Sequence, residues 1–313
     1  MPHPTVFSTR AKGKLLLSGE YAVLDGALAL ALPVRFGQSL RVAHDSEASG
    51  LHWTSRDSDG SVWFEAEFAL PGLDIQHSSN VQTAEALILM LKACRAQKPE
   101  FLSQTQGLRV WTDNDFPRAW GLGTSSTLIA ALGRWAGVDP YRVLFETLGG
   151  SGYDIACAYA EGPILYQLSN GMPQIQDVDF QPPFAENLYF IYLGKKQDSR
   201  AGIHRYRARA GENTALIAPV SQITEQLLAA QTLTAFETAL LEHEHLISRA
   251  LNLERAQDLY FPGYWGVIKS LGAWGGDFVL ATSARPEAET KAYFAQKGFE
   301  VFLPWAVALG QCR

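Results

Sequence analysis

The sequence has few cysteines: three among 313 residues. They stand far apart, at Cys94, Cys157 and Cys312, and form no Cys-x-x-Cys pair. Structural zinc sites and disulfide frameworks need cysteines that are closely and regularly spaced. The spacing therefore predicts incidental thiols in a reducing compartment, and we expect the protein to be cytoplasmic.

Clustered positive charge is also lacking. The chain has 26 Lys and Arg against 32 Asp and Glu, a formal net charge of -6, and its cations are scattered. Binding to a nucleic-acid backbone needs a concentrated basic face, so this composition argues against a nucleic-acid partner. A small anionic molecule needs only a local patch, and we expect a small-molecule substrate.

Long hydrophobic runs are missing as well. The longest, Ala27 to Val34, is far shorter than the ~20 residues that span a bilayer. Charged residues interrupt the apolar stretches near the N-terminus, so we expect neither a signal peptide nor a membrane partner. These charged residues are Arg10, Lys12, Lys14 and Glu20.

What the chain does contain is the balance of a globular protein. Hydrophobic residues make up 47% and charged residues 19%, which is enough to build a buried core. The length suggests about two domains. Three prolines between residues 168 and 183 predict a linker there, so we place the domains at 1–170 and 171–313.

The hydrophobic patterns predict a mixed α+β fold. Alternating segments predict antiparallel strands between residues 41 and 68, and a strand at 6–18 that bends at the basic residues 12–14. Further strands are predicted at 108–112, 188–193, 278–282 and 300–303. Helical spacing predicts helices at 83–95, 127–135, 140–148, 155–160, 203–209, 220–253 and 287–296.

The most informative stretch runs from Trp120 to Thr127 and reads Trp-Gly-Leu-Gly-Thr-Ser-Ser-Thr. Its two glycines let the backbone approach a ligand closely, and its hydroxyl residues stand where a helix begins. Free amides and the positive end of a helix dipole suit a polyphosphate, with a hydroxyl available to Mg²⁺. An ordinary Ser/Thr helix cap explains this stretch equally well when it is taken alone. Neither the Walker lysine nor the GxGxxG spacing is present.

Three other segments add chemistry to this one. The run 11–21 contains Lys14 and ends in Gly-Glu-Tyr. The run 149–156, Gly-Gly-Ser-Gly-Tyr-Asp-Ile-Ala, places Asp154 at the beginning of a helix after flexible glycines. The run 269–277 is Lys-Ser-Leu-Gly-Ala-Trp-Gly-Gly-Asp.

In this order the four stretches resemble the motifs of the GHMP kinase superfamily, whose members include galactokinase, homoserine kinase, mevalonate kinase and phosphomevalonate kinase. The landmarks extend from residue 11 to residue 282. The resemblance implies a two-domain α+β fold, with an N-terminal ATP-binding domain like ribosomal protein S5 domain 2 and a ferredoxin-like C-terminal domain. It also implies an enzyme that transfers a phosphoryl group from ATP, with Mg²⁺, to a small molecule.

The resemblance implies a role for individual residues. Asp154 would accept or orient the proton of an acceptor hydroxyl, and Lys14 would neutralise phosphate charge. Ser125 would ligate Mg²⁺ together with Glu146, for which a solvated helix carboxylate is the alternative. The nucleotide contacts fall on one continuous segment: Gly121, Leu122, Gly123, Thr124, Ser125 and Ser126.

The motifs are most similar to those of the mevalonate-pathway branch. The runs 13–21 and 150–156 are close to those of phosphomevalonate kinases, and the Gly-Tyr-Asp-Ile-Ala signature is similar to that of a distinct bacterial subgroup. Lys12 departs from the proline that is usual in the family, and Trp274 replaces a glycine in the last motif. A tryptophan there either narrows the acceptor pocket or fills space.

The acceptor contacts that the motifs suggest are Glu20, Tyr21, Lys195, Lys196, Ser199, Gly275 and Asp277. The basic loop 194–200 follows a buried strand and would hold a phosphate or carboxylate, which favours a phosphorylated acceptor. An ordinary polar loop is the alternative.

We therefore expect ATP-dependent phosphorylation of a hydroxyl or phosphate acceptor, with phosphomevalonate or mevalonate in isoprenoid precursor synthesis as the first candidates. One alternative is an ATP-dependent decarboxylase of the same superfamily that acts on a diphosphorylated acid. Another is a non-catalytic homologue that binds nucleotide or metabolite. Homodimers are common in the family, although nothing in the sequence identifies an interface.

The run Glu242-His243-Glu244-His245 has the residue types of a metal site but not the HExxH spacing. In a helix the two histidines point about 200° apart, so one face cannot hold both. We interpret the run as a solvated helix face.

Overall fold

The fold is known from a computed structural model that describes residues 4–104, 106–195, 199–208, 210–272, 274 and 277–311. Within these ranges, the side chains of 47–48, 199–201 and 210–213 are not described. The chain forms two compact units that are interleaved along the sequence: unit 1 holds residues 1–13, 36–118 and 122–159, and unit 2 holds the rest. Strands β1 (Thr5–Ser18) and β2 (Ala29–Ser49) contribute to both units. The division into domains at residue 170 stays a prediction.

Unit 1 is built on a sheet with the strand order β5-β4-β3-β6-β2. β3 (Leu51–Arg56) pairs in parallel with β6 (Gln106–Asn114), and β4 (Val62–Ala69) pairs antiparallel with β3 and β5 (Asp74–Ser78). Alternate residues of β3 are buried, as expected for a sheet with one face on the core.

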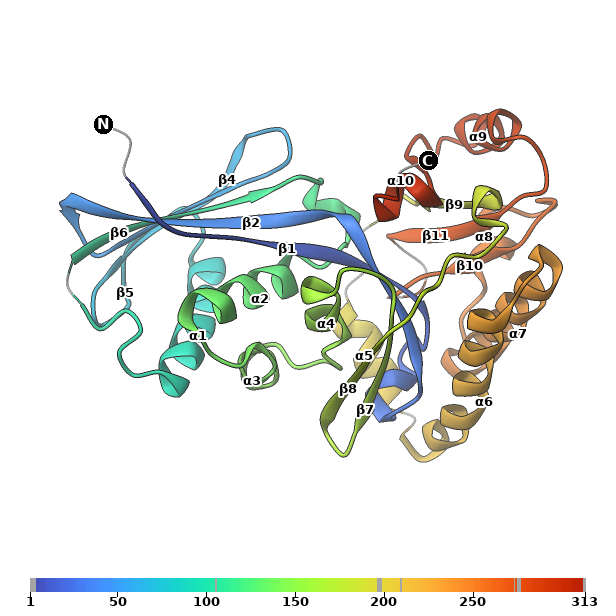
Figure 1. The fold of residues 1–313 in the computed structure, drawn as a ribbon, viewed down its shortest axis with the longest axis horizontal. Coiled ribbons are helices and arrows are strands. Elements are labelled where there is room, and N and C mark those ends of the chain that lie inside the picture. Colours follow the sequence, from blue (N-terminus) through green and yellow to red (C-terminus); the bar gives the residue numbers. More distant parts are fainter. Residues whose placement is uncertain are drawn as a thin grey trace. The chain divides into compact units, whose positions relative to one another are not determined.

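Four helices belong to unit 1: α1 (Val81–Gln97), α2 (Thr124–Ala136), α3 (Pro140–Thr147) and α4 (Tyr153–Tyr159). Figure 1 shows α1, α2 and α3 on one side of the sheet. The side chain of Asn80 accepts a hydrogen bond from Thr83 N at the start of α1, and Asp139 caps α3 in the same way. Apolar residues of the strands and helices form one core beneath the sheet.

Unit 2 contains an antiparallel sheet with the order β10-β11-β9-β12, formed by Ile268–Ser270, Phe278–Thr282, Leu188–Tyr192 and Phe302–Pro304. The hairpin of β7 (Ile164–Ser169) and β8 (Met172–Asp177) pairs with the first residues of β2. The helices are α5 (Ser199–Arg207), α6 (Ala210–Ala229), α7 (Leu233–Leu251), α8 (Ala256–Tyr260), α9 (Glu287–Gln296) and α10 (Trp305–Leu309). Short 3-10 turns occupy Ala22–Asp25 (η1), Arg118–Trp120 (η2) and Ala185–Asn187 (η3).

Three local predictions were wrong. The single helix predicted over 220–253 is two helices, because Thr232 caps a new helix by accepting a hydrogen bond from Ala235 N. The linker predicted between 168 and 183 contains β8, where Pro173 is tolerated because an edge strand leaves some backbone N–H groups unpaired. β1 runs without interruption through residues 12–14, where a bend was predicted.

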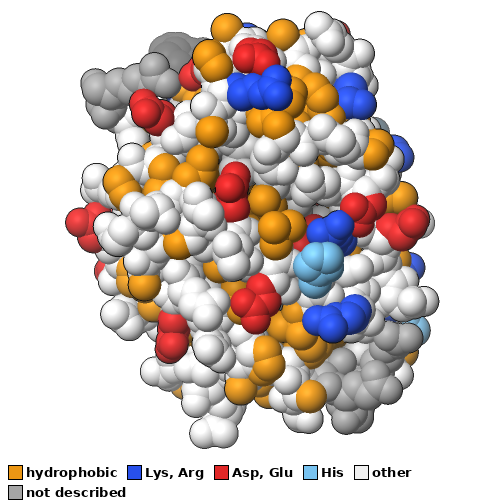
Figure 2. Space-filling model, turned by 90° about the vertical axis from the view of Figure 1, so that its right-hand side faces the viewer, with side chains coloured by type: hydrophobic (Ala, Val, Ile, Leu, Met, Phe, Trp, Pro, Cys, Tyr) orange, Lys and Arg blue, Asp and Glu red, His pale blue; other side chains and the backbone are white. Residues whose placement is uncertain are grey.

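The surface mixes side chains of both charges. On the face that Figure 2 shows, the Lys and Arg side chains that are described lie apart, and Asp and Glu side chains stand between them. Among the described residues, no helix combines the length and the apolar character that crossing a membrane requires.

Candidate functional site

The predicted phosphate loop leads into the N-terminus of α2 in unit 1. Gly123 is the N-cap residue, with φ 94° and ψ 41°, and α2 starts directly after it at Thr124. Because glycine has no side chain, the first amides of the helix receive no hydrogen bond from a capping side chain. Ser125 is exposed, so its hydroxyl is accessible. The N-cap is therefore a glycine and not a serine or threonine, and a helix start of this kind is suited to bind a phosphate.

Buried contacts within unit 1 fix the first turn of α2. Thr127 Oγ1 donates to Gln38 Oε1 on β2 at 3.1 Å, and both residues are buried. Just before the loop, the guanidinium of Arg118 binds Asp57 at 3.2 Å and lies 3.9 Å above the ring of Trp63. The chain is therefore held on both sides of the glycines that must keep their unusual backbone angles.

Asp154 lies in the first turn of α4, where its carboxylate is favoured by the positive end of the helix. Three glycines with positive φ, at positions 149, 150 and 152, form the turn that precedes it. α4 packs against α2: Tyr159 Oη donates to Ala130 O at 2.8 Å. Unit 1 thus brings together two of the predicted segments, the phosphate loop and the segment of the proposed acid–base residue.

Within unit 2, Lys14 meets the first glycine of the loop. Its Nζ donates to Gly121 O at 3.2 Å. A Cβ added to Gly121 would lie 2.2 Å from Asp277 Oδ2, so the carboxylate packs directly against this glycine. Three residues that were predicted from separate motifs, at positions 14, 121 and 277, are therefore neighbours.

Aromatic side chains hold the same stretch of unit 2. Trp120 packs edge-on against Phe278, with ring centroids 5.7 Å apart. Tyr192 Oη donates to Ala119 O at 2.9 Å, and burial, with a smaller effect of the Asp277 charge, raises the pKa of Tyr192. The rings restrict the backbone directly before Gly121.

Tyr21 lies at a strained turn between β1 and η1, with φ 59°. Its ring stacks on Tyr206 at 5.8 Å, and its hydroxyl lies so close to Gly202 of α5 that a Cβ there would be 2.3 Å away. Burial, together with the neighbouring Glu20 charge, raises the pKa of Tyr21 to about 12. The phenol is therefore neutral at physiological pH and can donate a hydrogen bond.

Glu20, which the motif suggested as an acceptor contact, is fully buried. Its Oε1 receives a hydrogen bond from Lys269 Nζ at 2.5 Å, and its Oε2 lies 3.2 Å from His243 Nε2. Glu244 is buried in the same place. The interpretation of residues 242–245 as a solvated face was wrong for His243 and Glu244, because α7 turns these two toward buried charges in unit 2.

The whole chain resembles solved structures of one fold. It matches L. major mevalonate kinase bound to R-mevalonate with 17% identity, a TM-score of 0.64, and coverage of 95% of this chain and 94% of that one. It matches Streptococcus pneumoniae phosphomevalonate kinase in complex with phosphomevalonate and AMPPNP at 17% identity, with a TM-score of 0.67 and coverage of 95% and 99%. Lactococcus lactis galactokinase, complexed with galactose, matches at 13% identity, with a TM-score of 0.65 and coverage of 94% and 92%.

The chain has the GHMP kinase fold. This confirms the predicted two-domain α+β class. No protein-family model and no curated protein matches the sequence. The motifs in the sequence therefore indicated a fold that is shared with proteins of very low sequence identity.

The structure gives less support to the other site residues predicted for this GHMP kinase fold. Glu146 on α3 has a side chain that is 46% exposed, and it faces Arg142 at 3.6 Å as a surface i,i+4 pair. Lys195 Nζ lies 4.9 Å from the centroid of the Tyr260 ring. Lys196 and Gly275 lie outside the described residues, as does the side chain of Ser199.

Trp274 is 3% exposed and packs into a cluster of unit 2 that includes Tyr21 and Tyr206. In the described part of the chain, no group of three or more His, Cys, Asp or Glu side chains is arranged to hold a metal ion. Ser125 and Glu146 stay the predicted ligands of a magnesium ion.

No role was predicted for Lys269 or His243. Lys269 stands inside an apolar run, Val-Ile-Lys-Ser-Leu, and a charge in such a run is a signal for a buried ion pair. Its partner Glu20 is 249 residues away in the sequence, and no local pattern connects the two.

Proposed function

We propose that the protein is an ATP-dependent small-molecule kinase. The observation that carries this proposal is the N-terminus of α2, where Gly123 with its positive φ leaves helix amides open to an anion. Kinases of several acceptors share the fold over about 95% of the chain, which supports the same reaction class. The acceptors named for these proteins include mevalonate, phosphomevalonate and galactose, so the fold leaves the acceptor open.

Phosphoryl transfer depends on positioning and charge neutralisation. ATP with Mg²⁺ supplies the phosphoryl group: a bond forms from the acceptor oxygen to the γ-phosphorus, the bond to the β-phosphate oxygen breaks, and ADP leaves. The amides of Gly121, Gly123 and Thr124 would hold the phosphates, with Ser125 and Glu146 on the metal. Lys14 would neutralise developing negative charge.

Asp154 would act on the acceptor. A hydroxyl acceptor loses a proton, and the Asp154 carboxylate would take it or hold the hydroxyl in line. A phosphorylated acceptor already has an ionised oxygen and needs cations instead, for which the loop with Lys195 and Lys196 is the candidate. The similarity of the motifs to the mevalonate-pathway branch makes phosphomevalonate or mevalonate our proposed acceptor.

Two glycines of α2 provide a matched test of nucleotide binding. Gly123 at the N-cap and Gly137 at the C-cap, with φ 69°, both have left-handed angles that cost other residues about 1–2 kcal/mol. Gly123→Ala should weaken AMPPNP binding in the presence of Mg²⁺ at least about tenfold, because it reorients the amides at the phosphate end. Gly137→Ala strains the opposite end of the same helix and should leave binding nearly unchanged.

Calorimetric titration of the folded variants with AMPPNP measures this difference. Equal losses in both variants would mean that helix strain alone explains the effect. Absence of AMPPNP binding by the wild-type protein would rule out the proposed function.

A further inference from the structure

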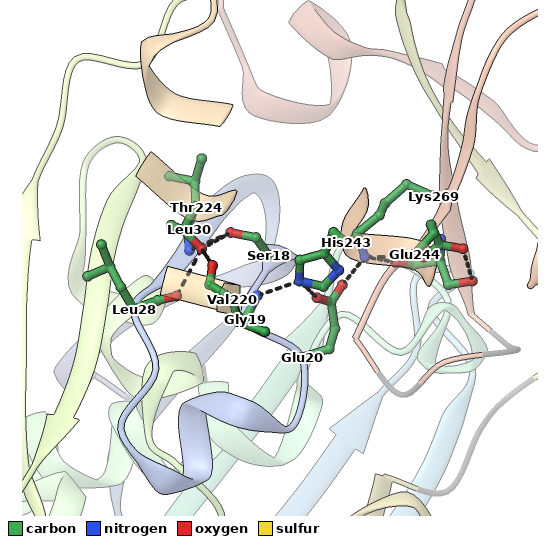
Figure 3. Close-up of polar contacts among 11 residues, drawn as sticks. Ser18, Gly19, Glu20, Leu28, Leu30, Val220, Thr224, His243, Glu244 and Lys269 are labelled. Carbon is green, nitrogen blue, oxygen red and sulfur yellow. Dashed lines mark hydrogen bonds and ion pairs between the residues drawn. The ribbon is translucent and has the colours of Figure 1, made fainter. Parts of the chain in front are cut away.

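Four ionisable side chains lie together in the interior of unit 2, and all are fully buried: Glu20 in the turn after β1, His243 and Glu244 on α7, and Lys269 on β10. Lys269 Nζ contacts Glu20 Oε1 at 2.5 Å and Glu244 Oε1 at 3.5 Å. Figure 3 shows the side chains pointing toward one another from this turn, from α7 and from β10. We call these four residues the buried charge network.

The network is also tied to the backbone. Gly19 N donates to His243 Nε2 at 3.2 Å, and Ser270 N donates to Glu244 Oε1 at 3.1 Å. The backbone just before Tyr21 and the backbone just after Lys269 are therefore each held by a side chain of α7. Each contact joins segments that are far apart in the sequence.

One proton completes the charge balance. With His243 neutral, one cation faces two carboxylates, and a net charge in this interior would be costly. Burial raises the pKa of Glu244 to about 7 and raises that of Glu20, whereas burial lowers the pKa of His243. The network thus reaches neutrality when one of the two carboxylates carries a proton. Either carboxylate can then be replaced by an amide without creating a net charge.

The network is adjacent in sequence to two predicted site segments. Glu20 directly precedes Tyr21, whose φ of 59° needs support from its surroundings. Lys269 and Ser270 begin the stretch that leads to Asp277, which lies against Gly121. The end of β1 is anchored a second time, because Ser18 Oγ hydrogen-bonds Thr224 Oγ1 of α6 at 2.8 Å (Figure 3).

We propose that Glu20 is a positioning residue: with His243, Glu244 and Lys269 it holds the Tyr21 turn and the backbone at Ser270 in the arrangement that receives the acceptor. This inference rests on the proposed kinase function. It replaces the direct acceptor contact that the motif suggested for Glu20. A carboxylate that is fully buried and already bound to an ammonium group acts through the backbone it anchors.

Two substitutions of Glu20 separate anchoring from charge. Glu20→Gln removes the charge but keeps an oxygen for Lys269 and a side chain of nearly the same size beside His243. Glu20→Ala removes the same charge together with both contacts. Anchoring predicts that the Gln variant behaves nearly as the wild type and that the Ala variant does not. A charge contact with the acceptor predicts equal losses in the two variants.

The first readout is hydrogen exchange of the intact protein, followed by mass spectrometry. We expect Glu20→Ala to speed exchange at least about tenfold in peptides covering 19–28 and 267–272, and to leave α2 and β6 unchanged. Uniform acceleration across the chain would indicate general destabilisation and would overturn a positioning role. If Glu20→Ala does not fold, Lys269→Met, which removes the cation instead, replaces it. Faster hydrogen exchange in the same two peptides alone would then support the positioning role.

The second readout is kinetic. With a turned-over acceptor, Glu20→Ala should raise the acceptor KM about tenfold or more and leave the KM for ATP within about twofold. Glu20→Gln should restore both values. Equal loss in the two variants would overturn the inference and return Glu20 to the role of an acceptor contact. If the wild type phosphorylates nothing, the proposed function fails, while the exchange experiment still tests the anchoring.

Discussion

Lys269→Met removes the single cation of the buried charge network and keeps nearly the same side-chain length. Lys269 is fully buried, and its ammonium group faces Glu20 at 2.5 Å and Glu244 at 3.5 Å. Removing one partner of a buried ion pair costs about 3–5 kcal/mol, because the remaining charge has neither water nor a counter-ion. For a protein of this size we expect the melting temperature to fall by roughly 6–20 °C.

Adding carboxylate substitutions to Lys269→Met identifies the cause. Glu20→Gln alone should change stability by less than about 1 kcal/mol, because Lys269 and Glu244 then balance each other. When Glu20→Gln and Glu244→Gln are both combined with Lys269→Met, no charge remains in the network, and at least ~2 kcal/mol of the loss should be recovered. Urea unfolding followed by circular dichroism gives the free energies of unfolding of the wild type and the three variants. The absence of recovery in the triple variant would refute the reasoning that an uncompensated carboxylate causes the loss.

Two further predictions concern the phosphate loop and the pH dependence of stability. Gly121→Ala should destabilise the protein by about 1–2 kcal/mol and weaken AMPPNP binding, because φ is +67° and the new Cβ would lie 2.2 Å from Asp277 Oδ2. Thermal unfolding measures the first effect and calorimetric titration the second. Unchanged AMPPNP binding would contradict the proposal that Gly121 contacts the nucleotide. Glu244 has a pKa raised to about 7 from 4.5, so the stability it contributes is complete below pH 4.5 and is lost as the pH rises through about 7. At ~1.4 kcal/mol per pH unit this loss is about 3 kcal/mol, and Glu244→Gln should abolish it. In urea unfolding, the variant should therefore have a higher free energy of unfolding than the wild type at pH 8 but not at pH 5.

The sequence predicted those elements whose signals are local. β11 and α9 have the predicted bounds, and α3 ends one residue earlier than predicted. The start of α3 follows from Asp139 and Pro140, which form a capping residue and a favourable first helical position. α2 begins three residues before its predicted start, because the hydroxyl residues from Thr124 to Ser126 already belong to the helix.

Long-range contacts account for what the sequence did not predict. The break between α6 and α7 depends on a single capping threonine inside an apolar, helix-favouring run. The burial of His243 and Glu244 depends on Glu20, in the turn after β1, and on Lys269 in β10, which no local pattern connects to α7. Helical spacing alone does not predict that these two residues are buried. The interior accepts them because groups of opposite charge lie beside them.

The candidate site was predicted in part. Motif order placed Lys14, Gly121 and Asp277 in one site, and unit 2 makes neighbours of these residues. The motif suggested that Glu20 contacts the acceptor, but its side chain is buried on Lys269. A Gly-Glu-Tyr signature therefore contains one anchoring residue and one strained aromatic residue, and only the structure distinguishes them.

The most direct test of the proposed kinase function is the release of ADP from ATP and Mg²⁺ with a panel of acceptors: mevalonate, phosphomevalonate, diphosphomevalonate, homoserine and galactose. Asp154→Asn removes the proposed acid–base group, and Asp139→Asn is the matched control, because Asp139 only caps α3 in the same unit. We expect turnover on one acceptor, a loss of about 10²-fold or more in Asp154→Asn, and near-normal turnover in Asp139→Asn. A folded wild-type protein that neither binds AMPPNP nor releases ADP with any acceptor would contradict the proposal, and release of carbon dioxide from diphosphomevalonate would identify a decarboxylase instead.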